Sequence, residues 1–239
     1  SNAGIEDESP LSSPFLMVPI AVLSQLKHNK MSAQESRQLL YWLHVANARG
    51  RYSRGSSETL LNEDLAILYR DGAPDKLLEP LKRQFGRFDI QPADLAGRGE
   101  RHPLFSLAFL ALKAKGATDW QSGLEISLKH QGRLHFVEYH HIFPKAVLRQ
   151  AGYETSQIYE IANMAFISGT TNRRLSNKPP FEYFPDVIRR RGVEALRNQC
   201  IPLEPELHRV ENYPRFLDAR RALLASEIDG FIGRALAGL

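Results

Sequence analysis

Residues 139–145 read Tyr-His-His-Ile-Phe-Pro-Lys, and this stretch decides how the second half of the chain is expected to fold. The residues at 134–139 alternate in character and suit a pleated surface, which predicts a strand. Because side chains alternate along a strand, His140 is expected on one face, with His141 starting a new conformation. Pro144 keeps the residue before it out of helical geometry, which predicts an extended turn after the histidine pair. Both imidazoles are therefore expected to face one pocket.

Further short elements are expected on either side of this stretch. A strand is predicted over residues 124–128, a short helix over 144–150 and another strand over 164–167. A turn at 168–170 then leads into a helix that begins near Thr171. The order is strand, loop, strand, helix.

Two asparagines occupy set places in that order, Asn163 just before a strand and Asn172 at the head of a helix. Together with the pair His140 and His141, their order and spacing resemble the HNH, or ββα-metal, nuclease motif. The sequence from Phe136 to Tyr183 is similar to the C-terminal nuclease domain of GmrSD-type, modification-dependent restriction proteins. The stretches that carry this resemblance are Tyr139-His-His-Ile-Phe-Pro-Lys145, Ile161-Ala-Asn-Met-Ala-Phe-Ile-Ser168, Thr171-Asn-Arg-Arg-Leu-Ser-Asn-Lys-Pro179 and, upstream, Arg51-Tyr-Ser-Arg-Gly-Ser-Ser-Glu-Thr59.

Hydrolysis of a DNA phosphodiester needs an activated water, a cation and a clamp on the backbone. His141 is the predicted general base, because imidazole titrates near neutral pH. His140 and Asn172 are the predicted ligands of one divalent metal ion, Mg²⁺ or Mn²⁺, with Zn²⁺ or Ni²⁺ as possible competitors. The resemblance gives Asn163 the role of holding His141 in its productive orientation through a hydrogen bond. It also implies products with a 5′-phosphate and a 3′-hydroxyl.

The sequence departs from many HNH proteins, which have an aspartate where His140 stands. Glu138, on the same strand face, is a candidate for restoring a negative charge, and Asn177 is a fallback ligand. Basic residues that follow the motif are interpreted as clamps on the DNA backbone. These are Arg173, Arg174, Lys178 and, less strongly, Lys145. The runs at 189–191 and 49–54 are either further DNA contacts or solvated helix ends.

The composition limits the binding partners, the cysteine-based sites and the location that can be expected. The chain has 239 residues, 31 Lys plus Arg against 27 Asp plus Glu, and a formal net charge of +4, which permits a DNA partner without requiring one. One cysteine, Cys200, excludes an intrachain disulfide and a zinc site with several thiolates, and favours a cytoplasmic location. No stretch approaches the roughly 18 apolar residues that span a bilayer, so no membrane partner is expected.

The first half of the chain is expected to be helical. A capping box at Ser32 and Glu35 begins a predicted helix over 32–48. Other helices are predicted over 58–70, 74–85, 103–115, 181–198 and 214–236. The fold class is thus α+β, predominantly helical, with a small ββα-metal unit embedded among the helices.

Three regions are expected: residues 1–14 as a tag scar and flexible leader, 15–120 as a helical region, and 121–239 as the nuclease domain with C-terminal helices. Relatives of the resembled kind carry an N-terminal, nucleotide-binding ParB-like domain. We expect it to be absent from this stretch of sequence.

Two alternatives to a nuclease are open. One is a catalytically inert DNA-binding or protein-docking module with a degenerate HNH fold. The other is a zinc-dependent hydrolase that uses His135, His140 and His141 as ligands. His130 and His135 are otherwise interpreted as residues outside the site.

Overall fold

The structure is a computed structural model that describes residues 11–53, 55–127 and 137–237. This part of the chain is mostly helical and contains a two-stranded antiparallel sheet, so its class is α+β as predicted. The chain divides into two compact units. Unit 1 comprises Ser1–Asp89, His102–Leu107 and Ile228–Leu239, and unit 2 comprises Ile90–Arg101 and Ala108–Glu227. The predicted boundary after residue 120 falls inside unit 2.

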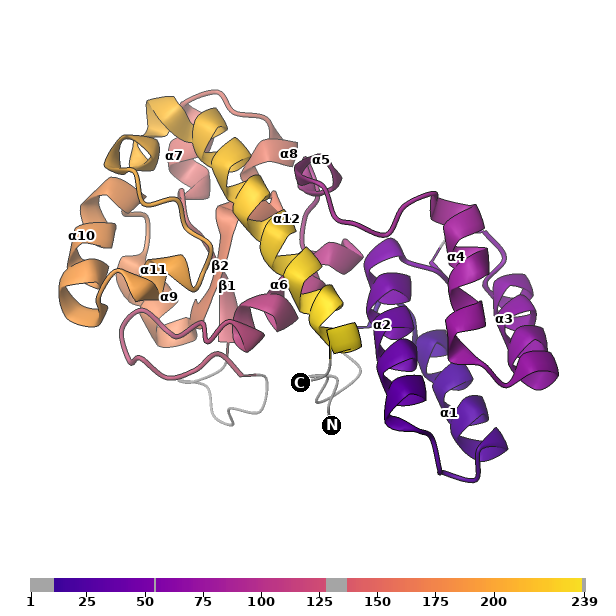
Figure 1. The fold of residues 1–239 in the computed structure, drawn as a ribbon. Helices are drawn as coiled ribbons and strands as arrows, with labels where there is room; N and C mark the ends of the chain where they lie inside the picture. Colours follow the sequence, from indigo (N-terminus) through magenta and orange to yellow (C-terminus); the bar gives the residue numbers. More distant parts are fainter. Residues whose placement is uncertain (1–10, 54, 128–136, 238–239) are drawn as a thin grey trace. The chain divides into compact units, whose positions relative to one another are not determined.

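Unit 1 is built from short helices around an apolar core (Figure 1). The capping box is confirmed, because the Ser32 hydroxyl accepts from the Glu35 N–H while the Glu35 carboxylate accepts from the Ser32 N–H. The helix ends at Gly50, whose φ of 65° lies in the left-handed region. Its elements are η1 (Pro14–Leu16), α1 (Met17–Leu26), α2 (Ala33–Arg49), α3 (Ser57–Asp71), η2 (Pro74–Leu77) and α4 (Leu78–Phe85).

Two prolines explain where the helix predictions in unit 1 differ from the structure. The single helix predicted over 74–85 is wrong, because a 3₁₀ turn, η2, precedes α4. The break puts Pro80 in the first turn of α4, where its missing N–H costs no helical hydrogen bond. Helix α1 was not predicted. Its Pro19 interrupts the sequence pattern but likewise lies in the first turn.

A buried ion pair accounts for part of the basic segment at 49–54. Arg51 is 1% exposed and donates to both carboxylate oxygens of Asp64, at 3.1 and 2.8 Å. Arg49 donates to the backbone carbonyl of Asp89. Arg51 therefore stabilises the core of unit 1 and is neither a DNA contact nor part of a solvated helix end, and Arg54 lies outside the described residues.

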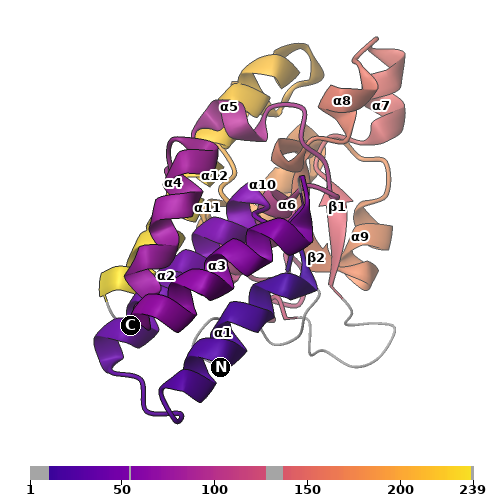
Figure 2. The same ribbon diagram turned by 90° about the vertical axis from the view of Figure 1, so that its right-hand side faces the viewer.

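Unit 2 contains the sheet. Strand β1 (Val137–His141) pairs antiparallel with β2 (Met164–Ser168), with His140 opposite Ala165 and His141 opposite Met164. Helix α9 (Gly169–Leu175) follows β2 directly and packs against both strands (Figure 2). The other elements are α5 (Pro92–Leu95), α7 (Lys145–Gln150), α8 (Thr155–Ile158), η3 (Ile161–Asn163), α10 (Pro180–Arg191), α11 (Glu194–Arg197), η4 (Pro205–His208) and η5 (Val210–Asn212). Helices α6 (Pro103–Ala114) and α12 (Tyr213–Ala237) contribute residues to both units.

Three predicted elements of unit 2 need correction. The described part of the predicted strand 124–128 forms only an isolated bridge, between Glu125 and Thr118. The strand expected to end at 139 continues to His141, because the backbone pairing with β2 extends that far. The helix predicted over 181–198 ends at Arg191, where Gly192 with a φ of 77° takes the chain out of helical geometry.

Aromatic packing holds the turn after β1. The ring of Phe143 is fully buried and lies 4.9 Å from those of both Tyr213 and Phe216, which belong to α12. Such contacts fix the loop by burial of apolar area, without a disulfide or a zinc knuckle. In the described residues, no helix combines the length and the apolar character needed to cross a membrane.

Candidate active site

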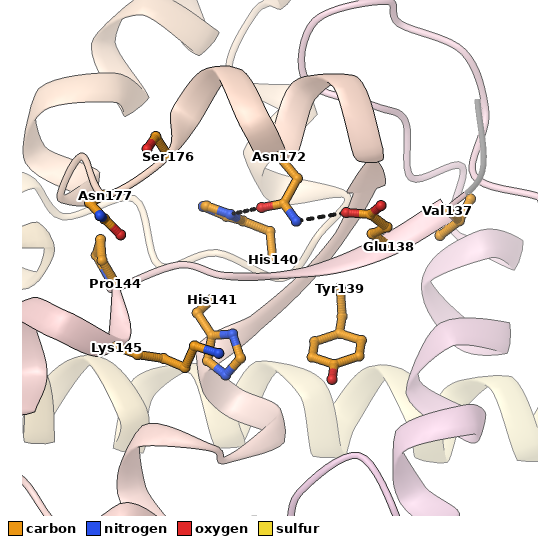
Figure 3. Close-up of a pocket in the computed structure, with 10 residues that line it drawn as sticks. All are labelled: Val137, Glu138, Tyr139, His140, His141, Pro144, Lys145, Asn172, Ser176 and Asn177. Atoms are coloured by element: carbon orange, nitrogen blue, oxygen red, sulfur yellow. Dashed lines mark hydrogen bonds between the residues drawn. The ribbon is translucent and has the colours of Figure 1, made fainter. Parts of the chain in front are cut away.

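A cleft of about 630 Å³ follows the open edge of β1. Both histidines line it, but they point to opposite faces of the strand (Figure 3). His140 faces α9, and His141 lies on the other face beside Tyr139 and Lys145. The prediction that His141 starts a new conformation is wrong, because it is the last residue of the strand. The same cleft nevertheless reaches both imidazoles.

A chain of hydrogen bonds connects His140 to two neighbours (Figure 3). The Asn172 amide oxygen lies 2.8 Å from His140 Nδ1. The amide nitrogen of the same residue donates to Glu138 Oε2 over 2.9 Å. Strand β1 supplies Glu138 and His140 because they are two residues apart on one face, and α9 supplies Asn172. The two predicted metal ligands are therefore neighbours.

Burial keeps His140 uncharged. The residue is 3% exposed and lies between the rings of Trp120 and Tyr183, at 6.2 and 5.8 Å. Burial lowers the pKa of His140 to about 4, opposed by the hydrogen bond with Asn172. Its Nε2 atom is buried and has no hydrogen-bond partner in the described part of the chain. At neutral pH the ring carries one proton and one lone pair, and while Nδ1–H donates to Asn172 Oδ1 the lone pair is on the buried Nε2.

His141 is half-buried against a different set of groups. Its ring meets the Tyr159 ring edge-on at 5.3 Å, and Lys145 Nζ lies 5.3 Å from the centre of that same ring. Arg149 donates to the Tyr159 hydroxyl over 3.0 Å. Burial first, and then the nearby charges of Lys145, His140 and Arg149, lower the pKa of His141 to about 4. A neutral imidazole can accept a proton, which is what a general base needs.

Asn163 lies under the turn that follows His141. Its side chain accepts from Phe143 N–H and donates to the carbonyls of Phe143 and Ile158, at 2.9, 3.2 and 3.0 Å. Its backbone carbonyl accepts from Ile142 N–H over 2.8 Å. The predicted direct hydrogen bond to the imidazole of His141 is absent among these contacts. Asn163 instead fixes the backbone directly after His141, which orients the ring indirectly.

We expect Asn163→Ala to lower the free energy of unfolding by roughly 2–4 kcal/mol, because it leaves a buried N–H and two buried carbonyls without partners. Urea unfolding followed by circular dichroism measures this change. Asn198→Ala is the matched control, since its amide makes one exposed bond to Gly116, and should cost less than about 1 kcal/mol. Equal stabilities for the two variants would contradict the assigned role of Asn163.

A buried aspartate that was not predicted fixes the start of α9. Asp119 accepts from Ser168 N–H over 2.7 Å and from the Thr171 hydroxyl over 2.9 Å. It also accepts from the N–H groups of Gln121 and Ser122 in its own turn. The spacing of Asp119 and Ser122 is typical of a side-chain-capped turn and was the available signal for it. Asp119 positions α9 and thereby Asn172.

The predicted DNA clamps do not lie together. Lys145 lines the main cleft, whereas Arg174 and Lys178 line a separate cleft of about 110 Å³, together with Arg190. Arg174 also donates to the Gln121 side chain over 2.8 Å. Arg173 lies near Glu138 of the main cleft, because its Nη1 atom and Glu138 Oε1 are 3.3 and 2.6 Å from the place that a Cβ on Gly169 would occupy.

The run at 189–191 is partly engaged by neighbouring groups. Arg189 pairs with Asp186 at 2.6 Å, and Arg191 donates to the backbone carbonyl of Gln121. Arg190 lines the smaller cleft with Arg174 and Lys178. Of these three arginines, Arg190 is thus the one that joins the predicted clamp residues.

The residues of the main cleft fit a single divalent cation. Two adjacent ligands of a six-coordinate Mg²⁺ or Mn²⁺ lie roughly 3 Å apart when each bond is about 2.1 Å. His140 Nδ1 and Asn172 Oδ1 are 2.8 Å apart, joined by a hydrogen bond in which Nδ1–H donates, so a cation would bind this pair only with the imidazole proton on Nε2. One imidazole nitrogen, one amide oxygen and a nearby carboxylate form a donor set suited to Mn²⁺ and Mg²⁺, with room on the cleft side for water and phosphate.

Other predicted ligands lie outside this arrangement. Asn177 lines the main cleft, but no hydrogen bond connects it to His140 or Asn172. His130 and His135 lie outside the described residues. Within the described ranges, no three His, Cys, Asp or Glu side chains converge as a group that could hold a metal ion.

Comparison with known proteins gives one relative and no family. No family model matches the chain, and no solved structure matches it. The chain is similar to an uncharacterized protein of Methanocaldococcus jannaschii, with 26% identity over 220 aligned residues. The match covers 79% of this chain and 36% of that protein. The chain thus spans about a third of the length of the curated relative that it matches.

Proposed function

We propose that this chain is a metal-dependent DNA endonuclease with an HNH-type ββα centre. One observation carries the proposal: the His140–Asn172 pair, separated by 2.8 Å, shares a cleft with His141, the next residue of the same strand. A buried histidine that served only packing would also need a hydrogen-bond partner, but it would not need to line an open cleft beside a second histidine. The order strand, strand, helix supports the same reading.

The chain's residues suggest a simple division of labour. His141, neutral at pH 7, accepts a proton from a water molecule as that water attacks the phosphorus. A new P–O bond forms and the bond to the 3′-oxygen breaks, and this oxygen leaves with the bonding electrons and takes a proton from solvent. The products carry a 5′-phosphate and a 3′-hydroxyl. Lys145, exposed at the cleft, attracts the phosphate.

His140 and Asn172 would hold the cation. A divalent cation supplies positive charge that stabilises the negative charge developing on the phosphate oxygens. Mg²⁺ or Mn²⁺ suits this role best, and Zn²⁺ or Ni²⁺ would compete through the imidazole.

The wider biological setting belongs to the same proposal. The resemblance to GmrSD-type proteins supports a nuclease part of a cytoplasmic, modification-dependent restriction or phage-defence protein. A nucleotide-binding N-terminal domain elsewhere in the full-length protein would be consistent with the longer chain of the relative. Selection of modified DNA would then depend on regions beyond this chain.

Plasmid cleavage tests the proposal directly. Supercoiled plasmid incubated with the protein and Mn²⁺ or Mg²⁺ should be converted to nicked and linear forms, and EDTA should stop the conversion. DNA binding without cleavage under either metal would overturn the proposal. It would support an inert DNA-binding module instead.

We expect the smaller cleft to contact the DNA backbone. Arg174→Ala and Lys178→Ala should each weaken DNA binding to a similar degree for all sequences, because a phosphate contact carries no base information. Each should reduce the slope of log K against log salt concentration by about 1. Fluorescence anisotropy at several salt concentrations, in EDTA, measures the slope. Arg215→Ala, which removes an exposed arginine of α12, is the control. Slopes equal to that of the control would contradict this placement of the DNA.

A further inference from the structure

Glu138 is the charged group nearest to the two predicted metal ligands. We propose that it is a positioning residue of the cation site, which orients the Asn172 amide and gives the site its negative charge. This inference rests on the proposed function, because it assigns a role toward the same cation. It adds a residue and a basis for metal preference.

The hydrogen-bond chain fixes which atom of Asn172 faces His140. An ionised carboxylate can only accept hydrogen bonds, so the Asn172 group that faces Glu138 Oε2 at 2.9 Å must be the amide nitrogen. The amide oxygen must then face His140, where it lies 2.8 Å from Nδ1. Oxygen, and not the NH₂ group, can bind a cation. Glu138 thereby sets the orientation that the proposed site requires.

Close packing holds the Glu138 carboxylate in place. A Cβ added to Gly169, the first residue of α9, would lie 2.6 Å from Glu138 Oε1, closer than two such atoms can approach. The carboxylate therefore occupies space that any other residue at 169 would fill. It lies against the same helix that presents Asn172, so strand and helix together define its position.

Charge is the second contribution of Glu138. Glu138 contributes the carboxylate of this hydrogen-bonded chain, whose other two members are an imidazole and an amide. Hard cations such as Mg²⁺ and Mn²⁺ favour sites with anionic oxygen, so Glu138 favours them over softer metals.

Titration of the chain with Mn²⁺, followed by isothermal calorimetry without DNA, tests the inference. Glu138→Gln should weaken Mn²⁺ binding by about 10- to 100-fold, because the introduced amide removes the charge and no longer dictates the orientation of Asn172. Glu182→Gln, an exposed glutamate of α10, is the matched control and should bind as the wild type does. Thermal melting without metal checks that each variant folds.

A second variant separates this role from a packing defect. In the double variant Glu138→Gln with Asn172→Asp, the introduced amide can donate to the introduced carboxylate, whose other oxygen faces His140. The charge of the pair and a hydrogen bond between the two side chains are then restored, with donor and acceptor exchanged, and Mn²⁺ affinity should recover at least tenfold over Glu138→Gln alone. A double variant no better than the single one would overturn the inference.

The outcomes also separate this inference from the proposed function. If the wild type binds Mn²⁺ and cleaves plasmid, and Glu138→Gln binds Mn²⁺ equally well, the role of Glu138 is wrong and the nuclease proposal stands. If the wild type neither binds Mn²⁺ nor cleaves plasmid, both the nuclease proposal and the role of Glu138 are wrong.

Discussion

Replacing His141 with alanine is expected to lower the rate of DNA cleavage by about 10²- to 10⁴-fold, because the attacking water loses its proton acceptor. The half-buried ring makes edge contacts with Tyr139 and Tyr159 at 5.9 and 5.3 Å, and its Nε2 atom has no hydrogen-bond partner in the described part of the chain. Its loss should therefore leave the fold, Mn²⁺ binding and DNA binding largely intact.

Plasmid cleavage under single-turnover conditions measures this rate, with calorimetry and melting curves as checks on cation binding and folding. His28→Asn is a matched control, since it removes an exposed imidazole at a φ of 50°, a conformation that asparagine tolerates. Its cleavage rate should equal that of the wild type. Equal rates for His141→Ala and the wild type would show that another group activates the water.

Replacing Arg220 with alanine is expected to lower the free energy of unfolding by about 3–5 kcal/mol. Arg220 is fully buried, and its partners are three backbone carbonyls, those of Ala162, Gln199 and Cys200, at 2.8, 3.1 and 3.3 Å. Removing the guanidinium leaves all three carbonyls buried without a donor. Because Ala162 immediately precedes Asn163, the loss should also loosen the turn after His141.

Urea unfolding at pH 7 measures this loss. Arg197→Ala is the control, because Arg197 is exposed and pairs with Glu194 on its own helix, and it should change the unfolding free energy by less than about 1 kcal/mol. Arg220→Lys should fall between the two, since an ammonium keeps the charge but cannot match the fork of the guanidinium. A loss below about 1 kcal/mol in Arg220→Ala would mean that water replaces the guanidinium.

The elements that carry the candidate site in unit 2 were predictable, because the sequence patterns that indicate them are local. The strand that carries the histidines, the turn at Pro144 and the helix that carries Asn172 each depend on residues within a few positions of one another. The capping box at Ser32 and Glu35 was predictable for the same reason. Patterns of this kind predict which elements form and in what order.

Long-range partners were beyond such patterns. Asp119 reaches Ser168 and Thr171 across 49 and 52 residues of sequence. The sequence near Asp119 gave no sign that this carboxylate would bind the N-cap residue and first turn of α9. The basic appearance of Arg51 likewise suggested DNA, because its buried partner Asp64 belongs to the next helix. Sequence spacing indicates which residues are candidates for the site, whereas tertiary contacts determine which of them lie next to one another.

The Glu138–Asn172–His140 chain lies between these two cases. Alternation along a strand correctly predicted that Glu138 and His140 share a face. The resemblance to the HNH motif predicted that Asn172 would lie beside His140, but nothing in the sequence predicted its hydrogen bond to Glu138 or the room that Gly169 leaves for the carboxylate. The site therefore depends on the packing of α9 against the two strands.

The most direct test of the central claim is anomalous diffraction from crystals soaked in Mn²⁺. We predict one strong anomalous peak in the main cleft, within about 2.3 Å of an imidazole nitrogen of His140 and of Asn172 Oδ1. Mn²⁺ bound elsewhere, with no peak at His140 and Asn172, would contradict it.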